Sequence, residues 1–273
     1  MTQTNDQLRE TVRQKYADIA RSSSDSCCGS SSCCGDSAEG ELGYSMIGEA
    51  YDGVEGYVAD ADLNLGCGVP VEHAGMVSGQ TVLDLGSGAG LDAFVSRRQV
   101  GESGHVIGVD MTAEMIAKAR SNVDQLGFSN VEVRLGEIEH LPVVNDSVDV
   151  VISNCVLNLV PDKRQAFAEI YRVLEPGGHF CISDIVSSKA LPEWASGIAA
   201  AYAGCVAGAI PRKNYLQIIR DTGFREVEVV SERRVELPEA LLDEWLTPEQ
   251  QSEAAASDIY VMSVTVKAVK EGE

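Results

Sequence analysis

The sequence predicts an α/β fold in which a mostly parallel sheet carries helices on both faces. Short apolar segments of strand length alternate with segments of helical periodicity from about residue 81 onward. Glycine and proline turns separate these segments, as at 86–90 and 176–178. With 273 residues, of which 44% are hydrophobic, the chain is long enough to bury a sizeable core.

Seven segments have the composition of strands. Five of them alternate with helical segments, which implies parallel pairing. The fourth is apolar almost throughout, as is typical of a strand buried on both faces. The last two are expected to form an antiparallel pair. The expected strands are 82–85, 105–110, 131–135, 148–153, 179–185, 227–235 and 259–269.

The helical segments are identified by their periodicity and by the signals at their ends. An amphipathic helix over 4–21 places Leu8, Val12, Tyr16 and Ile19 on one face. The other expected helices lie between Thr112, which is expected to cap the first of them, and Gly127, and then over 162–174, 187–210 and 212–222.

Two domains are expected, an N-terminal arm over 1–45 and the α/β domain over 46–273. The arm contains a tract rich in Ser, Gly and Cys at 21–40, which lacks the apolar residues that a core requires. The Ala- and Gly-rich insertion at about 187–210 is expected to cover a substrate pocket as a lid.

The chain is strongly acidic. It has 21 Lys and Arg against 42 Asp and Glu, a net charge of −21, so nucleic acid and anionic membranes are unfavourable partners. The first ten residues are polar, so a secretory leader is not expected. The longest uncharged stretch, 194–211, is built of Ala and Gly and suits a packed helix or lid better than a membrane span. We therefore expect a cytoplasmic protein.

A nucleoside site is expected where the first strand ends. The loop over 86–90 follows a strand and precedes a helix, and Asp110 lies 22 residues beyond Gly88, where an acid reaches ribose hydroxyls. A tight turn without a ligand is the alternative. Nicotinamide binding is less favoured, because position 91 is Leu and because Asp84 would repel a pyrophosphate. A carboxylate at Asp84 suits a cationic sulfonium, which favours S-adenosylmethionine.

Eight cysteines in a reducing cytosol suggest metal, metalloid or redox chemistry. Cys155 follows the fourth strand, Cys67 lies between two glycines, and Cys205 lies in the insertion, so these three thiols are expected to converge over the pocket. Soft thiolates select thiophilic centres such as trivalent arsenic. The alternative for each single cysteine is a small buried hydrophobe, which we adopt for Cys181.

Several motifs resemble those of the class I methyltransferases, namely DLGSGAG, GVDM, the stretch GEIEHLPVVNDSVDVVISNCVLNLVPDK and RVLEPGG. The resemblance implies a Rossmann-like fold with a seven-stranded sheet and an antiparallel last strand, and it makes S-adenosylmethionine the cofactor. It also implies site residues: Gly86, Ser87, Gly88 and Gly90 at the methionine end, Asp110 on the ribose, Met111, Ile138 and Glu139 beside the adenine, and Asn154 facing the sulfonium.

Three further motifs, NLGCG, ISNCVLNL and AGCVAGAIPRKNY, resemble the arsenite methyltransferases. This resemblance implies that Cys155 and Cys205 hold arsenic and that Cys67 can form a disulfide with Cys155 during turnover. It also implies arsenite or its thiol conjugates as substrate, glutathione or thioredoxin as reductant, and a monomer. A functional upstream cysteine is assigned to Cys34, with Cys33 as the alternative. The further C-terminal domain of many relatives is expected to be missing.

Two other functions remain open from the sequence. One is a carbon or oxygen methyltransferase acting on a quinone-like small molecule, which would share every cofactor motif. The other is a non-catalytic, thiol-rich protein that binds arsenic; an NAD-dependent oxidoreductase is a more distant third. The pairs Cys27-Cys28 and Cys33-Cys34 either capture arsenite or supply a resolving thiol, unless they bind metal only adventitiously.

Overall fold

The structure, a computed structural model, describes residues 4–22, 51, 53–197, 206, 208–236, 242–243 and 245–272.

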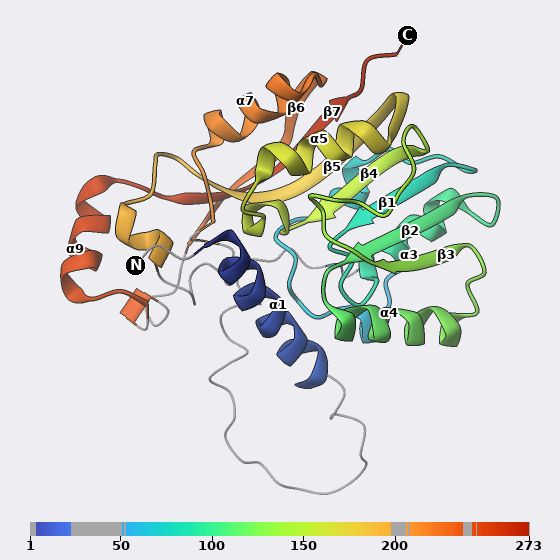
Figure 1. The fold of residues 1–273 in the computed structure, drawn as a ribbon, viewed down its shortest axis with the longest axis horizontal. Coiled ribbons are helices and arrows are strands. Elements are labelled where there is room, and N and C mark those ends of the chain that lie inside the picture. The colour runs from blue at the N-terminus through green and yellow to red at the C-terminus, as the bar shows by residue number, and fades with distance from the viewer. Residues whose placement is uncertain are drawn as a thin grey trace, which may run out of the picture.

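One seven-stranded sheet organises the molecule, as the sequence predicts (Figure 1). The strand order is β3-β2-β1-β4-β5-β7-β6. Pairing is parallel from β3 to β5, whereas β7 is antiparallel to both of its neighbours. The strands are β1 Thr81–Leu85, β2 His105–Asp110, β3 Val131–Leu135, β4 Val148–Asn154, β5 Leu174–Ser187, β6 Arg225–Val235 and β7 Val261–Val269.

Helices cover both faces of this sheet and define two cores (Figure 1). One core lies under α2 Pro70–His73 and α3 Leu91–Val100, with α4 Ala113–Leu126 on the same side. The other lies under α5 Lys163–Val173 and α7 Arg212–Thr222. The central strands therefore have few polar side chains, because each of their faces meets apolar helix residues. A further helix, α9 Pro248–Ser257, precedes β7 and begins with a capping box of Thr247 and Gln250.

Two local expectations need correction, and a third is described only in part. The fifth strand begins already at Leu174, because Gly177 and Gly178 exchange backbone hydrogen bonds with Lys270 instead of forming a free turn. Thr112 precedes α4 but its side chain makes no capping hydrogen bond; its N–H donates to Asp110 Oδ1 at 2.8 Å. Of the insertion expected at 187–210, the described part contains only a short 3₁₀ helix, Glu193–Gly197, and residues 198–205 and 207 lie outside the described residues.

The N-terminal helix, α1 Asn5–Ser22, packs on the α/β domain (Figure 1). Its Val12 is buried in one apolar cluster with Cys67 and Cys155. Ion pairs hold the helix along its length: Arg9 pairs with Glu139, Arg13 with Glu137 and Arg21 with Glu114. Sequence periodicity predicts this helix but not the surface against which it lies.

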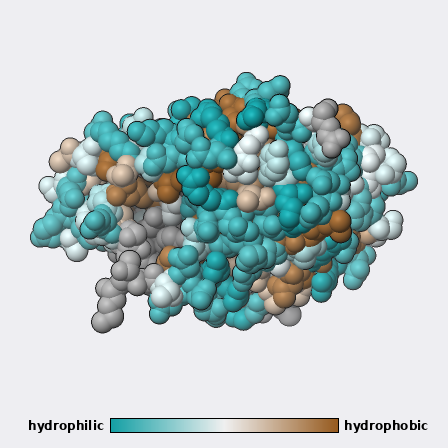
Figure 2. Space-filling model, turned by 45° about the horizontal axis from the view of Figure 1, so that its top comes forward, coloured by the Kyte–Doolittle hydropathy of each residue, from teal (hydrophilic) through white to brown (hydrophobic). Residues whose placement is uncertain are grey.

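One face of the surface can be described by its hydropathy. Figure 2 shows a face that is mostly hydrophilic, with separate hydrophobic patches. Among the described residues, no helix is both long and apolar enough to cross a bilayer.

Candidate active site

A cavity of about 320 Å³ opens at the carboxyl ends of β1, β2 and β4. This is the edge at which ligands bind in open parallel sheets. The glycine-rich turn after β1 forms its floor, the loop at 61–66 forms one wall, and α1 contributes Arg9, Val12 and Tyr16. The cavity therefore joins the edge of the sheet to the N-terminal helix, two parts of the chain that the sequence leaves separate.

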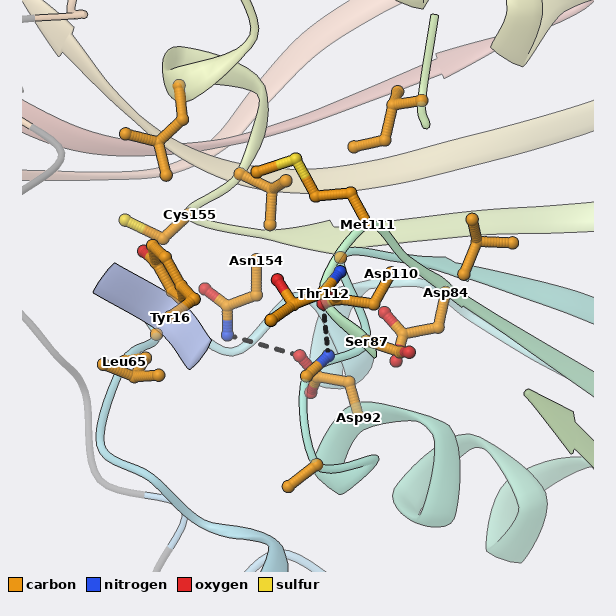
Figure 3. A pocket seen from close by; sticks show the side chains of 18 of the residues that line it. Tyr16, Leu65, Asp84, Ser87, Asp92, Asp110, Met111, Thr112, Asn154 and Cys155 are labelled. Carbon is orange, nitrogen blue, oxygen red and sulfur yellow. Dashed lines mark hydrogen bonds between the residues drawn. The ribbon is translucent and has the colours of Figure 1, made fainter. Parts of the chain in front are cut away.

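Three carboxylates, two buried and one half-buried, line this cavity (Figure 3). Burial raises the pKa of Asp84 and Asp110, and it raises the pKa of Asp92 to about 6. Each is desolvated, which disfavours the charged form. A cationic ligand would restore the ionised form, whereas a pyrophosphate would be repelled.

The glycine-rich turn after β1 brings its backbone N–H groups close to the carboxylate of Asp110. Gly86 has a φ of 69° and Gly88 a φ of 51°, a region that glycine adopts without strain. Gly88 N donates to Asp110 Oδ2 at 3.0 Å, and a side chain added at Gly88 would meet only open space. Gly90, also in the left-handed region, precedes α3 against the Phe94 ring and does not line the cavity.

Two polar atoms at this turn have no partner among the described residues, namely Asp84 Oδ2 and Ser87 Oγ. Buried polar atoms are normally satisfied, so this pair fits a ligand that brings donors of its own. S-adenosylmethionine has a cationic amino and sulfonium end and ribose hydroxyls, and it therefore fits the carboxylates and the open turn.

The residues predicted beside the adenine also line the cavity. Met111, Ile138 and Glu139 all line the cavity. The Glu139 carboxylate, however, is already bonded: it accepts from Arg9 Nη2 at 2.9 Å, from Arg9 Nε at 3.3 Å and from Asp162 N at 3.3 Å. In this structure Glu139 therefore anchors α1, and a contact with adenine stays a prediction.

Two of the predicted cysteines belong to one buried apolar cluster. Cys67 and Cys155 are both buried and belong to one cluster, and Cys155 lines the cavity. Cys155 has a φ of 61°, which is uncommon for a residue with a side chain and is typical of functional sites. Its N–H donates to Ser183 O at 2.8 Å, which helps to hold this conformation.

The other cysteines are placed differently. Cys181 lies in the core under α2 and α3, and burial raises its pKa to about 12, so its thiol stays protonated at neutral pH. The remaining predicted site cysteines, Cys205 and Cys34, lie outside the described residues, as do Cys27, Cys28 and Cys33.

Asn154 lies between the acidic side and the cysteine side (Figure 3). Its Nδ2 donates to Tyr51 Oη at 2.8 Å and lies 3.3 Å from Asp92 Oδ2, and Tyr51 Oη donates to Asp92 Oδ1 at 2.5 Å. Its Oδ1 accepts from Cys67 N at 2.9 Å. One amide therefore connects the carboxylates to the loop that carries Cys67.

Sequence reasoning missed several residues of this site. Asp92 carries the one available signal, a carboxylate in the first turn of the helix that follows the glycine loop. Tyr51, Arg9 and Tyr16 carry none, because they reach the cavity only through the packing of distant segments.

Comparisons with known proteins agree with this geometry. Residues 76–223 match the family described as "Methyltransferase domain". An arsenite methyltransferase of Halobacterium salinarum is 48% identical over 231 residues, which cover 82% of this chain and 59% of the relative. The human arsenite methyltransferase is 41% identical over 169 residues, 58% of this chain and 44% of the relative. The chain thus spans less than two thirds of the length of either relative.

A solved structure of an arsenic methyltransferase is also similar to this chain. The arsenic (III) S-adenosylmethionine methyltransferase from Chlamydomonas reinhardtii superposes with a TM-score of 0.65 at 34% identity. The match covers 76% of this chain and 68% of that one.

Proposed function

Because the chain belongs to the methyltransferase family and is similar to its arsenite methyltransferases, we propose that it methylates trivalent arsenic with S-adenosylmethionine. The observation that carries the proposal is the pair of buried cysteines, Cys67 and Cys155, beside a cavity lined by buried carboxylates. Thiolates are the ligands that suit a soft centre, and carboxylates suit a cationic sulfonium.

In this proposal, different residues contact different parts of the cofactor. Asp84 and Asp92 face the cationic end of the cofactor, Asp110 accepts from the ribose hydroxyls, and the glycine turn lies under the methionine end. When bound, S-adenosylmethionine supplies an activated methyl group on a sulfonium.

The cysteines would hold and orient the substrate. Cys155 and Cys205 bind arsenic, with Cys67 close to Cys155, and displace its oxygen or thiol ligands. The arsenic lone pair carries no proton, so no general base is needed and orientation is the main contribution of the protein. The products are S-adenosylhomocysteine and methylated arsenicals. Transfer would form an As–C bond and break the methyl–sulfur bond, which leaves arsenic formally pentavalent. A pair of cysteine thiols would reduce it to the trivalent state by forming a disulfide. We place the reaction in the cytoplasm, where glutathione or thioredoxin would return this disulfide to thiols.

The test is incubation of the protein with S-adenosylmethionine, arsenite and glutathione, followed by chromatographic speciation of arsenic. We expect methylated arsenic from the wild type and none from Cys155→Ser or Cys205→Ser. Cys181→Ser is the matched control, because this thiol lies in the core away from the cavity, and it should retain activity. A methyltransferase of quinone-like molecules would instead produce no methylated arsenic and would transfer methyl groups to its own acceptor in all three variants.

A further inference from the structure

The side-chain amide of Asn154 forms hydrogen bonds with the backbone of Cys67 and Gly68. Its Oδ1 accepts from the N–H of Cys67 itself at 2.9 Å and from the N–H of the next residue, Gly68, at 3.3 Å. Its Nδ2 donates to Gly68 O at 2.8 Å. The side chain therefore replaces the secondary-structure partners that this loop lacks, since residues 64–69 belong to no helix or strand.

The loop is built to approach this amide closely. A Cβ added at Gly66 would lie 2.7 Å from Asn154 Nδ2, and one added at Gly68 would lie 2.7 Å from Ser183 Oγ. Ser263 Oγ donates to Cys67 O at 2.6 Å from the other side. Glycines on both sides of the cysteine thus let the loop reach Asn154 and β5.

Asn154 is also the residue directly before Cys155. Neighbouring side chains of an extended strand point to opposite faces, and the left-handed conformation of Cys155 interrupts this alternation where β4 ends. Asn154 therefore holds the backbone of Cys67, and the next residue in the chain is the second cysteine, Cys155. The position of one thiol relative to the other depends on these two consecutive residues.

We propose that Asn154 is a positioning residue for the thiol pair: its amide fixes the Cys67 loop so that the sulfurs of Cys67 and Cys155 meet on one ligand atom. The proposal rests on the proposed function, because trivalent arsenic is taken as that ligand. The role differs from a contact of Asn154 with the cofactor, because it acts on the thiols when no cofactor is present.

The test uses phenylarsine oxide without S-adenosylmethionine. This trivalent arsenical forms two As–S bonds with a thiol pair, and the two thiol protons leave with its oxygen as one water, so no oxidant or reductant is required. Affinity is measured by competition with a small dithiol. The parent is the full chain carrying Ser at the five cysteines that would compete for the probe: Cys27, Cys28, Cys33, Cys34 and Cys205.

In this parent, Asn154→Ala should weaken phenylarsine oxide by about tenfold, because a hydrogen bond to a buried backbone group is lost. Asn154→Asp keeps an oxygen acceptor for Cys67 N, but its ionised form loses the donor to Gly68 O and places a second carboxylate beside Asp92. Relative to the parent at the same pH, its affinity should therefore recover only towards acid pH, where the carboxyl is protonated and can donate. Asn130→Ala is the matched control: that amide also holds glycine carbonyls, Gly101 O and Gly104 O, but does so away from the cavity, and its loss should leave the affinity unchanged.

A second variant covers the case in which Asn154→Ala fails to fold. Gly66 does not adopt a positive φ, and the three atoms nearest to an added Cβ all belong to the Asn154 amide. Gly66→Ala should therefore push this amide aside and weaken the probe as well. Gly272→Ala, which has only one backbone atom at 4.0 Å, is its control and should not. Failure of the parent to bind the probe, or wild-type affinity in Asn154→Ala or Gly66→Ala, would overturn the proposal. A loss in Asn130→Ala equal to that in Asn154→Ala would do so too. The proposed function fails separately, if the wild type makes no methylated arsenic.

Discussion

The charge of Asp92 is expected to make cofactor binding depend on pH. It is buried in the cavity, accepts from Tyr51 Oη and lies beside Asn154. Burial is the main cause of its raised pKa, and the hydrogen bonds from Tyr51 and Asn154 lower the pKa only in part. The carboxylate is thus poised so that a nearby cation shifts it to the ionised form.

The affinity for S-adenosylmethionine should depend on pH around this group. With a pKa of about 6, Asp92 is ionised above pH 7 and becomes protonated as the pH falls through 6, so the cationic cofactor should bind progressively more weakly below that value. Isothermal titration from pH 5 to 8 measures this. Asp92→Asn should bind weakly throughout and lose the inflection near pH 6; an unchanged inflection in this variant would assign the titration to another group.

Asp184 allows a stability prediction. It is fully buried, its carboxylate accepts from Asn158 N and Ile185 N, and burial raises its pKa to about 7 against an ordinary value of 3.8. Between about pH 4 and 7 the folded chain keeps a proton that the unfolded chain has lost. This group therefore lowers the free energy of unfolding as pH rises through that window, by at most roughly 1.4 kcal/mol per pH unit.

Asp184→Asn should remove this contribution while leaving an acceptor for the two N–H groups. Urea unfolding of both proteins at several pH values between 4.5 and 8 gives the difference in stability. The variant should gain relative to the wild type as the pH rises towards 7. A difference that does not vary with pH would show that Asp184 has the same charge in both states.

At the scale of elements, most of the sheet could be predicted from the sequence, because periodicity and turn residues are local signals. The expected helix over 212–222 matches α7, and the antiparallel final pair matches β6 and β7. The start of β5 could not be predicted, because its first residues are ordered by a partner strand almost a hundred residues away. Turn residues indicate a break there, and the pairing with Val148 and Lys270 overrides it.

The residues of the site also fall into those that short motifs predict and those that depend on distant packing. The glycine turn, Asp84 and Asp110 belong to short motifs with fixed spacing, and they line the cavity as placed, apart from Gly90. The positions of Arg9 and Tyr16 depend on where α1 packs, and an amphipathic pattern specifies an apolar face but not its partner. The same limit applies to Asn154, whose grip on the Cys67 loop joins residues far apart in the chain.

The docking of α1 should matter for the cofactor. Arg9 forms two hydrogen bonds to Glu139, whose side chain is only 5% exposed, and both residues line the cavity. Arg9→Ala removes the ion pair that holds α1 against the cavity, so the wall formed by α1 should open. We therefore expect S-adenosylmethionine to bind several-fold more weakly and α1 to exchange its amide hydrogens faster. Arg21→Ala removes an ion pair between exposed side chains further along the same helix and should change neither. Equal effects of the two substitutions would attribute the loss to general weakening of the helix.

At the scale of the whole molecule, the dominant property is the surplus of acid. The charge of −21 is spread over a chain that already buries several carboxylates. Self-repulsion of this kind favours solubility and opposes compactness. The ion pairs on α1 oppose it locally by placing arginines against Glu114, Glu137 and Glu139.

Salt should therefore stabilise the fold. Raising the ionic strength from about 0.01 M to about 1 M shortens the screening length from roughly 30 Å to 3 Å, which weakens repulsion between distant carboxylates. It also weakens exposed ion pairs, but each of these contributes only about 0–1 kcal/mol, so the gain should dominate and the melting temperature should rise. Differential scanning calorimetry in NaCl and in KCl should give coinciding curves when plotted against ionic strength, since screening does not depend on the identity of the cation. A falling melting temperature would mean that the ion pairs along α1 and elsewhere outweigh the repulsion.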